Sequence, residues 1–354
     1  MIHAVITATG CYIPEVEIEN QYFAGNSFLE KDGTPVKKPG DVLIRKLTEI
    51  SGIERRRYAQ KGQLTSDIAA LAAEAALSEN GTDRETLDYI IVAHNFGDVS
   101  DSSSTVNIVP SVASKVKNYL GIKNPDCVAY DLPFGCPGWV EAMIQANYYI
   151  RSGDAKRCLV IGADIMSRVL DPYDRDSMLF SDGSGAAILE ASEGPAGIIA
   201  HKTRTFADEN NLLIDMGASL NPDYKPDELT IKMNGRKVYE FALSHVPALI
   251  RDLLDQHQIP LTSISKVLIH QANEKMDAAI LERLFKLYNI TDIPSDIMPM
   301  TISWLGNSSV ATIPTMLDLI RKGQLPGHQI NAGDRVIFAS VGAGMSINAL
   351  VYQA

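Results

Sequence analysis

Cys136 lies where a short apolar segment meets a long apolar helix, in the sequence YDLPFGCPGW of residues 130–139. Proline suits the first position of a helix because its missing N–H would have had no partner there. The thiol is therefore expected beside unpaired N–H groups and the positive end of a helix dipole, which favour an anion. This position predicts a cysteine with a lowered pKa that acts as a nucleophile. The alternative is a small buried hydrophobic residue, which is how most free cysteines behave.

His270 and Asn307 each follow an apolar segment that we interpret as a strand. His270 comes after residues 267–269, and Asn273 is placed to cap the helix that follows. Ligands of α/β sheets bind beyond the carboxyl ends of the strands, so we expect His270 at a binding site. The alternative is a buried histidine with a structural role. Asn307 lies in the sequence LGNSS of residues 305–309, for which ordinary turn and cap chemistry is the alternative.

The three residues together indicate a particular chemistry. A cysteine thiolate takes an acyl group from a thioester, while a histidine N–H and an asparagine amide hydrogen-bond a developing enolate oxygen. Asparagine cannot act as a base, so the trio favours oxyanion stabilisation. Peptide hydrolysis would instead need the histidine as a base, held by an orienting group. Cys136, His270 and Asn307 therefore predict acyl-thioester chemistry.

The elements that would position these residues occur twice, roughly 175 residues apart, which is the size of one domain. A helix expected over 65–79 leads to a strand over 89–92, and a helix expected over 237–255 leads to a strand over 267–269. His94 follows the first of these strands as His270 follows the second. We expect His94 to be structural.

The repetition continues through the rest of the chain. The corresponding pairs are strands at 127–130 and 302–305, strands at 158–161 and 335–338, and glycine turns at 181–185 and 340–344. Alternating strands and helices predict an α/β protein whose largely parallel sheets are covered on both faces. We expect two similar halves, residues 1–193 and residues 194–354, with residues 25–40 as an inserted surface loop.

Composition narrows the class of protein. The chain has 354 residues, of which 45% are hydrophobic and 21% are charged, and its net charge of -11 argues against nucleic-acid binding. No apolar run approaches the roughly 20 residues of a membrane span, and residues 1–5 do not resemble a signal peptide, so we expect a cytoplasmic protein. The cysteines form no CxxC pair and no zinc pattern, and we expect Cys11, Cys127 and Cys158 to be core residues.

Many short motifs carry a family resemblance. They are SGIERR (51–56), VPS (109–111), GC (135–136), DRDS (174–177), SDGSGA (181–186), MNGR (233–236), HQAN (270–273), GNSS (306–309) and GAG (342–344). In this order they resemble β-ketoacyl-acyl-carrier-protein synthase III, a condensing enzyme of the thiolase superfamily. The resemblance covers nearly the whole chain and is interrupted mainly by residues 25–40.

The resemblance implies a thiolase-like, five-layered αβαβα fold of two duplicated halves that works as a homodimer. It implies that Cys136 carries the acyl group and that His270 and Asn307 bind the thioester carbonyl of the second substrate. The backbone N–H groups of Cys136 and Ala343 would form a further oxyanion hole, with alanine where the family usually has glycine. No metal or organic cofactor is implied. The substrates would be acyl thioesters of acyl carrier protein or coenzyme A.

The chain also departs from the family's common pattern. Relatives that accept coenzyme A primers often have a tryptophan and an arginine where Lys46 and Ile50 stand here. Val109 replaces an aromatic gate that the partner subunit contributes, which would leave more room for an acyl chain. Arg175 matches a residue that contacts the coenzyme. Lys275 stands where the family often has a basic residue that meets the acidic carrier protein.

From the residues and the resemblance together, we expect a ketosynthase III-like acyltransferase. An acyl thioester would load Cys136, and a malonyl- or β-ketoacyl-thioester would then attack it in a Claisen condensation. The departures favour a medium or long primer and a specialised lipid pathway, such as one of the alkylresorcinol type. Two alternatives stay open: an acyltransferase or thioester hydrolase that uses the same acyl-cysteine, and a non-catalytic subunit of a heterodimeric condensing enzyme.

Overall fold

A computed structural model describes residues 2–354, and its first half forms a five-stranded sheet in the order β1-β9-β8-β4-β7. Strand β4 is parallel to both of its neighbours, and β9 is antiparallel to both of its own. Almost every residue of β4 and β8 is buried, as expected for strands covered on both faces. The bounds are β1 (Ile2–Tyr12), β4 (Tyr89–His94), β7 (Val128–Pro133), β8 (Arg157–Ile165) and β9 (Asp182–Glu193).

The second half forms a four-stranded sheet in the order β10-β15-β14-β13. It repeats the arrangement of the first sheet, because β15 is antiparallel to both neighbours and β13 is parallel to β14. The bounds are β10 (Gly197–Thr205), β13 (Ile264–Ile269), β14 (Arg335–Gly342) and β15 (Ser346–Gln353). Each sheet thus takes its strands from one side of residues 194–196. The division into halves at residues 193 and 194 stays a prediction.

One predicted strand is wrong. Residues 302–305, the counterpart of β7, form the short helix α7 (Ile302–Leu305), in which the Gly306 N–H donates to the Ile302 carbonyl at 3.0 Å. The Ser303 carbonyl accepts from the Glu54 N–H at 2.9 Å, so this segment bonds to the chain beside β3 rather than to a sheet. A segment of four residues, three of them apolar, fits a strand or a buried helix equally well, and periodicity could not decide between them.

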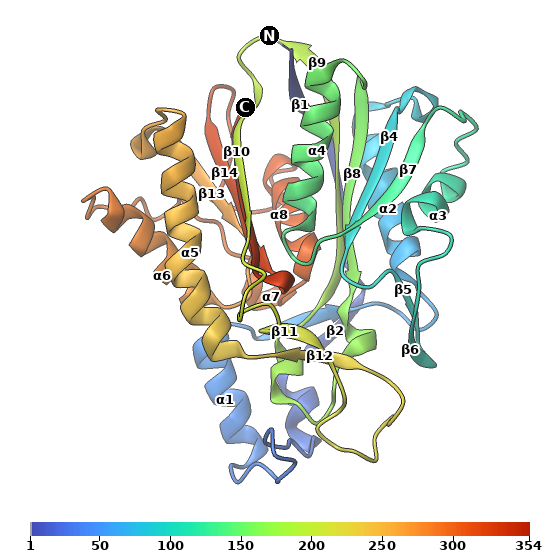
Figure 1. Cartoon of the computed structure of the whole chain (residues 1–354), viewed down its shortest axis with the longest axis vertical. Coiled ribbons are helices and arrows are strands. Elements are labelled where there is room, and N and C mark those ends of the chain that lie inside the picture. The colour runs from blue at the N-terminus through green and yellow to red at the C-terminus, as the bar shows by residue number, and fades with distance from the viewer. Residues whose placement is uncertain (1) are drawn as a thin grey trace.

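Helices and sheets alternate in five layers (Figure 1). Helices α2 (Thr65–Asn80) and α3 (Val112–Tyr119) cover the outer face of the larger sheet, and α5 (Gly235–Gln256) and α6 (Glu274–Leu287) cover that of the smaller sheet. Helices α4 (Gly138–Ser152) and α8 (Thr312–Arg321) lie between the sheets. The predicted αβαβα fold class is confirmed.

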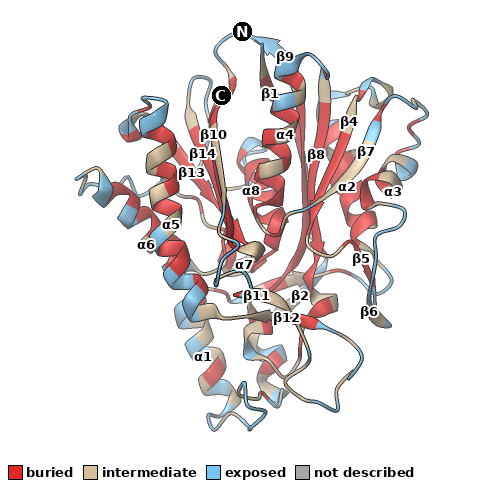
Figure 2. Cartoon of the chain, viewed as in Figure 1, coloured by how far each residue is buried: buried red, intermediate tan, exposed pale blue. Residues whose placement is uncertain are grey.

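The middle layer joins the two halves. Trp139 of α4 meets Phe338 of β14 edge to face, with ring centroids 5.9 Å apart, and both side chains are fully buried. The Ile6 N–H of β1 donates to the Tyr352 hydroxyl of β15 at 3.0 Å. One cluster of buried residues extends from one sheet through α4 and α8 to the other, and these elements are mostly coloured as buried in Figure 2. The two halves therefore share one core, which holds residues of one half at fixed positions relative to residues of the other.

Smaller elements lie at the ends of the sheets, most of them around the carboxyl edges, except two short helices that lead into the amino ends of β4 and β13. They are the strand pairs β2 (Val16–Glu19) with β3 (Arg55–Tyr58), β5 (Asp98–Ser100) with β6 (Ser103–Asn107), and β11 (Ile214–Gly217) with β12 (Thr230–Met233), and the short helices η1 (Asn20–Gly25), η2 (Arg84–Thr86), η3 (Met166–Val169), η4 (Arg175–Leu179), η5 (Leu261–Ser263), η6 (Ser309–Ala311) and η7 (Ala343–Met345). In the part of the chain from residue 2 onward, each helix is too short or too polar to cross a membrane.

The predicted loop runs through residues 26–39 and ends where α1 (Gly40–Ser51) begins. It is anchored to the protein, because Phe28 is buried in a small cluster with Leu43 of α1 and Met178 of η4. This anchoring brings the basic end of the loop beside α1, next to a surface pocket described below.

Candidate active site

Cys136 lies in the turn between β7 and α4. Gly135 has a φ of 65°, a left-handed conformation that favours glycine, and Pro137 is the cap of the helix that begins at Gly138. The helix ends at Ser152 and is capped by Gly153, which is also left-handed. The predicted position of the thiol at a helix N-terminus is therefore correct.

His270 directly follows β13, and its N–H donates to the Ala339 carbonyl of β14 at 2.9 Å. Three residues later, Asn273 Oδ1 accepts from the Met276 N–H at 3.0 Å and so caps α6, as predicted. The side chain of His270 is 3% exposed, and its Nδ1 has no hydrogen-bond partner among residues 2–354. A buried polar atom without a partner is a place where a ligand can bond.

Asn307 lies between α7 and η6, after Gly306, whose φ of 66° is left-handed. A Cβ on Gly306 would stand 2.8 Å from the Cβ of Arg56, so this close turn requires glycine. Asn307 Oδ1 accepts from the Ser309 N–H at 2.9 Å. This bond orients the side-chain amide, and its nitrogen remains available as a donor for a ligand.

The structure brings the three predicted residues together. Cys136, His270 and Asn307 line one buried cavity of about 40 Å³, although they come from different elements and from both halves of the chain. The rest of the lining is mostly apolar, with side chains such as Met166, Phe180, Ile214, Ile231 and Val341. A small, largely apolar space with a few converging polar groups is typical of a site where chemistry proceeds away from water.

Burial raises the pKa of the Cys136 thiol to about 12, with a hydrogen bond from Ser309 acting in the opposite direction and the Asp164 charge adding to the increase. This is contrary to the lowered pKa that the helix N-terminus alone predicts. The thiol touches the cavity on one side but is otherwise enclosed by protein, and enclosure in an apolar site disfavours the thiolate. The Cys136 thiol is therefore mostly protonated at neutral pH in the ligand-free protein.

Burial also lowers the pKa of His270 to about 4, and a hydrogen bond with the Ser309 backbone offsets this only in part. The imidazole is therefore neutral at ordinary pH. It adds no positive charge beside the thiol, and it can bond an oxygen in the cavity only as a neutral group.

The backbone at Ala343 meets the cysteine turn closely. A Cβ on Gly342 would lie 2.8 Å from the Cys136 nitrogen, and one on Gly135 would lie 3.1 Å from the Ala343 nitrogen. Cys136 and Ala343 both line the cavity, and Ala343 is not among the residues with positive φ in the described chain. The backbone angles at Ala343 are therefore compatible with a side chain, and its backbone nitrogen lies close to the turn that carries Cys136.

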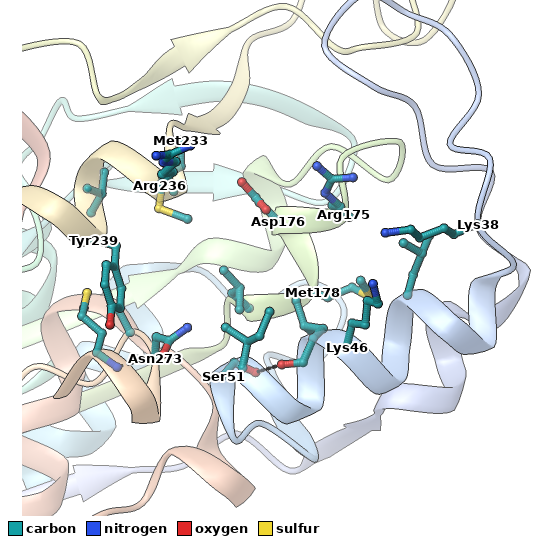
Figure 3. Close-up of a pocket in the computed structure, with 18 residues that line it drawn as sticks. Lys38, Lys46, Ser51, Arg175, Asp176, Met178, Met233, Arg236, Tyr239 and Asn273 are labelled. Atoms are coloured by element: carbon teal, nitrogen blue, oxygen red, sulfur yellow. Dashed lines mark hydrogen bonds between the residues drawn. The ribbon is translucent and has the colours of Figure 1, made fainter. Parts of the chain in front are cut away.

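A larger pocket of about 490 Å³ opens beside this cavity at the surface. Four residues line both spaces: Met233, Val238, Ala272 and Met276. In Figure 3, Lys38, Lys46 and Arg175 gather at one end of the larger pocket, and Tyr239 and Asn273 lie at the other. The larger pocket is thus positioned as an entrance to the cavity that holds Cys136.

The remaining predicted binding residues lie in different places. Arg175 lines the entrance and contacts Glu30 at 3.4 Å, and Lys46 and Ile50 line it from α1. Lys275 is exposed on the first turn of α6, beside the entrance but outside its lining. Val109 is 82% exposed and belongs to neither lining within this single chain.

Three further residues at the site were not singled out from the sequence. Asn95 lines the cavity, Ser309 Oγ lies 3.3 Å from the Cys136 Sγ, and Asp164 accepts two hydrogen bonds from Asn95. A weak signal existed, since Asn95 follows β4 and Asp164 lies near the end of β8, at the edge of the sheet where ligands bind. Among the described residues, no group of three or more metal-ligating side chains is placed to hold a metal ion.

Comparison with known proteins agrees with this geometry. Residues 130–206 match the family model of 3-oxoacyl-[acyl-carrier-protein] synthase III, and residues 254–354 match the model of its C-terminal part. The chain is 34% identical over 360 residues to β-ketoacyl-[acyl-carrier-protein] synthase III of Rhodobacter capsulatus, with 99% of each chain covered.

Solved structures show the same likeness. The synthase III of Aquifex aeolicus superposes with a TM-score of 0.77 at 28% identity, covering 99% of this chain and 100% of that one. The synthase III of Thermus thermophilus gives a TM-score of 0.80 at 27% identity, with 99% of both chains covered.

Proposed function

Because the chain belongs to the 3-oxoacyl-[acyl-carrier-protein] synthase III family of condensing enzymes, we propose that Cys136 is the residue that carries the acyl group. An acyl thioester enters through the larger pocket, transfers its acyl group to the sulfur and releases its carrier thiol. A malonyl- or β-ketoacyl-thioester then binds, and its α-carbon becomes a nucleophile by loss of carbon dioxide or of a proton, respectively. This carbon attacks the acyl-cysteine, the new C–C bond replaces the C–S bond, and the Cys136 sulfur leaves. The product is a β-keto thioester longer than the primer. No metal or organic cofactor takes part in this scheme.

The observation that carries the proposal is the convergence of Cys136, His270 and Asn307 on one small, mostly apolar cavity. His270 and the amide nitrogen of Asn307 bind the carbonyl oxygen of the second thioester and stabilise the charge that develops on it. The N–H groups of Cys136 and Ala343 serve the carbonyl of the acyl-cysteine. Both partners are held close in a site that excludes water, which supplies proximity as well.

The basic end of the entrance supports a phosphopantetheine thioester as the substrate. Lys38, Lys46 and Arg175 lie there together, and the hydrogen bond and positive charge of Lys46 lower the pKa of Lys38. Cations that crowd one another favour an anion between them, such as the phosphate of a pantetheine arm. Lys275, exposed beside the entrance, would meet the acidic surface of an acyl carrier protein.

We further propose a homodimer in which Val109 of the partner subunit borders the acyl site. Val106, Ile108 and Val109 are exposed side by side in sequence, at the end of β6 and just after it. A run of exposed apolar residues marks an interaction surface. The cavity beside Cys136 is small in the single chain, so a medium or long primer would need room gained at this boundary. Such a primer fits a specialised lipid pathway, for example one of the alkylresorcinol type.

The test is to identify the product. The enzyme is incubated with carrier-bound acyl primers of increasing length, or with acetyl-coenzyme A, together with a malonyl thioester, and products are identified by mass spectrometry. A lengthened β-keto product supports condensation, and preference for a longer carrier-bound primer supports the specialised role. Free acid or a transferred ester without chain extension would instead indicate a hydrolase or a simple acyltransferase. Strong preference for acetyl-coenzyme A would contradict the longer primer.

A further inference from the structure

Among the described residues that line the larger pocket, Asp176 alone carries a carboxyl group. The other charged side chains of this lining are cations, namely Lys38, Lys46, Arg175 and Arg236. In Figure 3, Asp176 lies between the end of the pocket that holds the two lysines and the end that holds Tyr239. A ligand that extends from the basic end toward the catalytic cavity therefore passes beside this carboxyl group.

The position of Asp176 is fixed by its neighbours. Asp174 caps the short helix η4, because its Oδ1 accepts from the Asp176 N–H at 3.0 Å. Lys232 of β12 holds Asp174 through an ion pair at 3.6 Å. A Cβ on Gly235, the first residue of α5, would lie 3.8 Å from Asp176 Oδ2. The carboxyl group thus stands beside the first turn of α5.

The carboxyl group of Asp176 has no partner within the protein. Among residues 2–354, no hydrogen bond or ion pair reaches either of its oxygens. The nearby guanidinium groups face other acids, since Arg175 lies 3.4 Å from Glu30 and Arg236 lies 3.0 Å from Glu240. A carboxylate accepts from several donors, so both oxygens remain available to a ligand.

Asp176 is mostly ionised at neutral pH. Burial and the charge of Asp174 raise its pKa to about 6, while the charges of Arg175, Lys31 and Lys232 act in the opposite direction. At pH 7, roughly nine in ten of these groups are therefore carboxylates. A hydrogen bond to an ionised acceptor is stronger than one to a neutral acceptor.

The larger pocket offers few other acceptors. In the described part of its lining, the remaining side-chain oxygens belong to Ser51, Tyr239 and Asn273. Asn273 Oδ1 already accepts from the Met276 N–H at 3.0 Å. Ser51 Oγ already accepts from the Ile53 N–H at 3.2 Å. An N–H group that enters this mostly apolar pocket therefore finds its strongest acceptor at Asp176.

We propose that Asp176 accepts an amide N–H of a pantetheine arm and so selects thioesters whose carrier has this arm. The inference rests on the proposed function, in which such a thioester enters through the larger pocket to reach Cys136. A pantetheine arm has two secondary amides between its phosphate and its thiol. With the phosphate beside Lys38 and Lys46 and the thiol at Cys136, the amides lie along the part of the pocket where Asp176 stands.

Asp176 acts on the arm and not on the reacting atoms. It lies outside the lining of the catalytic cavity, so its replacement leaves Cys136, His270 and Asn307 in place. An amide N–H that leaves water and finds no acceptor weakens binding, whereas a thioester without an N–H has nothing to lose. The difference between two such thioesters therefore reports the contact with Asp176.

The first test measures binding of S-methylpantetheine, an unreactive thioether that keeps both amides, by isothermal titration calorimetry. In Asp176→Ala, the dissociation constant should rise about tenfold, because a hydrogen bond to a charged acceptor is lost. Asp176→Asn keeps a neutral oxygen acceptor and should raise the constant about threefold. An unchanged constant in folded Asp176→Ala would overturn the proposal. If that variant does not fold, an unchanged constant in Asp176→Asn would do so.

Glu49 supplies the matched control. It belongs to α1 but lies outside the lining of the larger pocket, and its side chain is 61% exposed and faces Arg45 at 3.9 Å. Glu49→Gln removes one negative charge from a helix that borders the pocket, so the dissociation constant should stay within about twofold of the wild-type value. A tenfold rise in this variant too would mean that net charge controls binding, and it would contradict the proposed contact.

The second test follows acylation of Cys136 by intact-protein mass spectrometry. Two thioesters with the same acyl group are compared, one of pantetheine and one of methyl 3-mercaptopropionate, which has no N–H. Asp176→Ala should slow loading from the pantetheine thioester about tenfold and loading from the other thioester less than about twofold. Equal losses with the two thioesters would show that Asp176 only supports the structure, and would refute the selection.

Coenzyme A and acyl carrier protein share the pantetheine arm, and the same variant distinguishes these two sources. The carrier from which loading falls about tenfold in Asp176→Ala is the one whose arm Asp176 contacts. No loss with either carrier contradicts the proposal. Binding of S-methylpantetheine needs no acylation, so the two proposals can fail separately. A protein that binds this probe through Asp176 but is never acylated at Cys136 would refute only the proposed function.

Discussion

His94 and His270 occupy equivalent places in the two halves, yet their surroundings differ. His94 ends β4, is 2% exposed, accepts from the Gly97 N–H at 2.9 Å and lies 3.1 Å from Asp131. His270 follows β13, is 3% exposed and lines the cavity that holds Cys136. Each ring has one buried nitrogen without a well-aligned hydrogen bond, so the Asp131 carboxylate near His94 and the cavity beside His270 are what distinguish them. The fold supplies the same position twice, and the neighbouring groups decide whether a histidine there holds the structure or meets a ligand.

The largest expected effect comes from removing the cavity histidine. His270→Ala should lower the rate of condensation about 100- to 1,000-fold, because one donor to the developing oxyanion is lost. Loading of Cys136 should fall less than condensation, because His270 is proposed to bind the carbonyl of the second thioester rather than that of the primer. His94→Gln should lower condensation by about tenfold at most. Steady-state kinetics of the purified variants measure the condensation rate. If His270→Ala and His94→Gln lower that rate equally, the two histidines do not differ in function.

The second prediction concerns how the free energy of unfolding depends on the protonation of His270. The folded protein protonates His270 only near pH 4, whereas the unfolded chain does so near pH 6.5. The contribution of the neutral ring is therefore fully present above about pH 6.5 and is lost as the pH falls toward 4. The free energy of unfolding should drop by at most about 3 kcal/mol over this window.

Urea unfolding of wild type and His270→Gln at several pH values measures this contribution as a difference between the two proteins. The difference removes the titration of the carboxylates, which is common to both. A constant difference across the window would mean that His270 titrates normally in the folded protein.

The smallest expected effect concerns His94. The His94→Gln variant should unfold with about 1–3 kcal/mol less free energy at neutral pH, because Asp131 and the Gly97 N–H lose buried partners. Asp131→Asn should have a similar effect. Asp131 also accepts from the Val112 and Ala113 N–H groups, both at 2.8 Å, and so fixes the start of α3. Unchanged midpoints in urea would show that this pair does not stabilise the fold.

Much of the fold could be predicted because it depends on local patterns. Buried strands, glycine turns and the cap at Asn273 leave clear signals in the sequence, and their repetition indicated two similar halves. The short helix α7 could not be recognised, because a segment of four residues is too short to show a period. The anchoring of residues 26–39 was also missed, since the burial of Phe28 depends on partners distant in sequence.

The residues of the candidate site were likewise predicted only in part from the sequence. Cys136, His270 and Asn307 were found because each stands at a strand or turn boundary with a chemically distinctive side chain. Asn95, Asp164 and Ser309 were not singled out, because their importance arises from contacts between segments far apart in the chain. The predicted lowering of the Cys136 pKa was wrong for a related reason. A helix N-terminus can be inferred from local sequence, but the enclosure that raises the pKa requires the packed protein.

The central claim is that Cys136 accepts an acyl group, and intact-protein mass spectrometry tests it most directly. Wild-type protein and Cys136→Ala are each incubated with a panel of acyl thioesters of carrier protein and coenzyme A. The account predicts that the wild type gains the mass of one acyl group and that Cys136→Ala gains none. An adduct that persists in Cys136→Ala, or a wild-type protein left unmodified by every thioester in the panel, would contradict it.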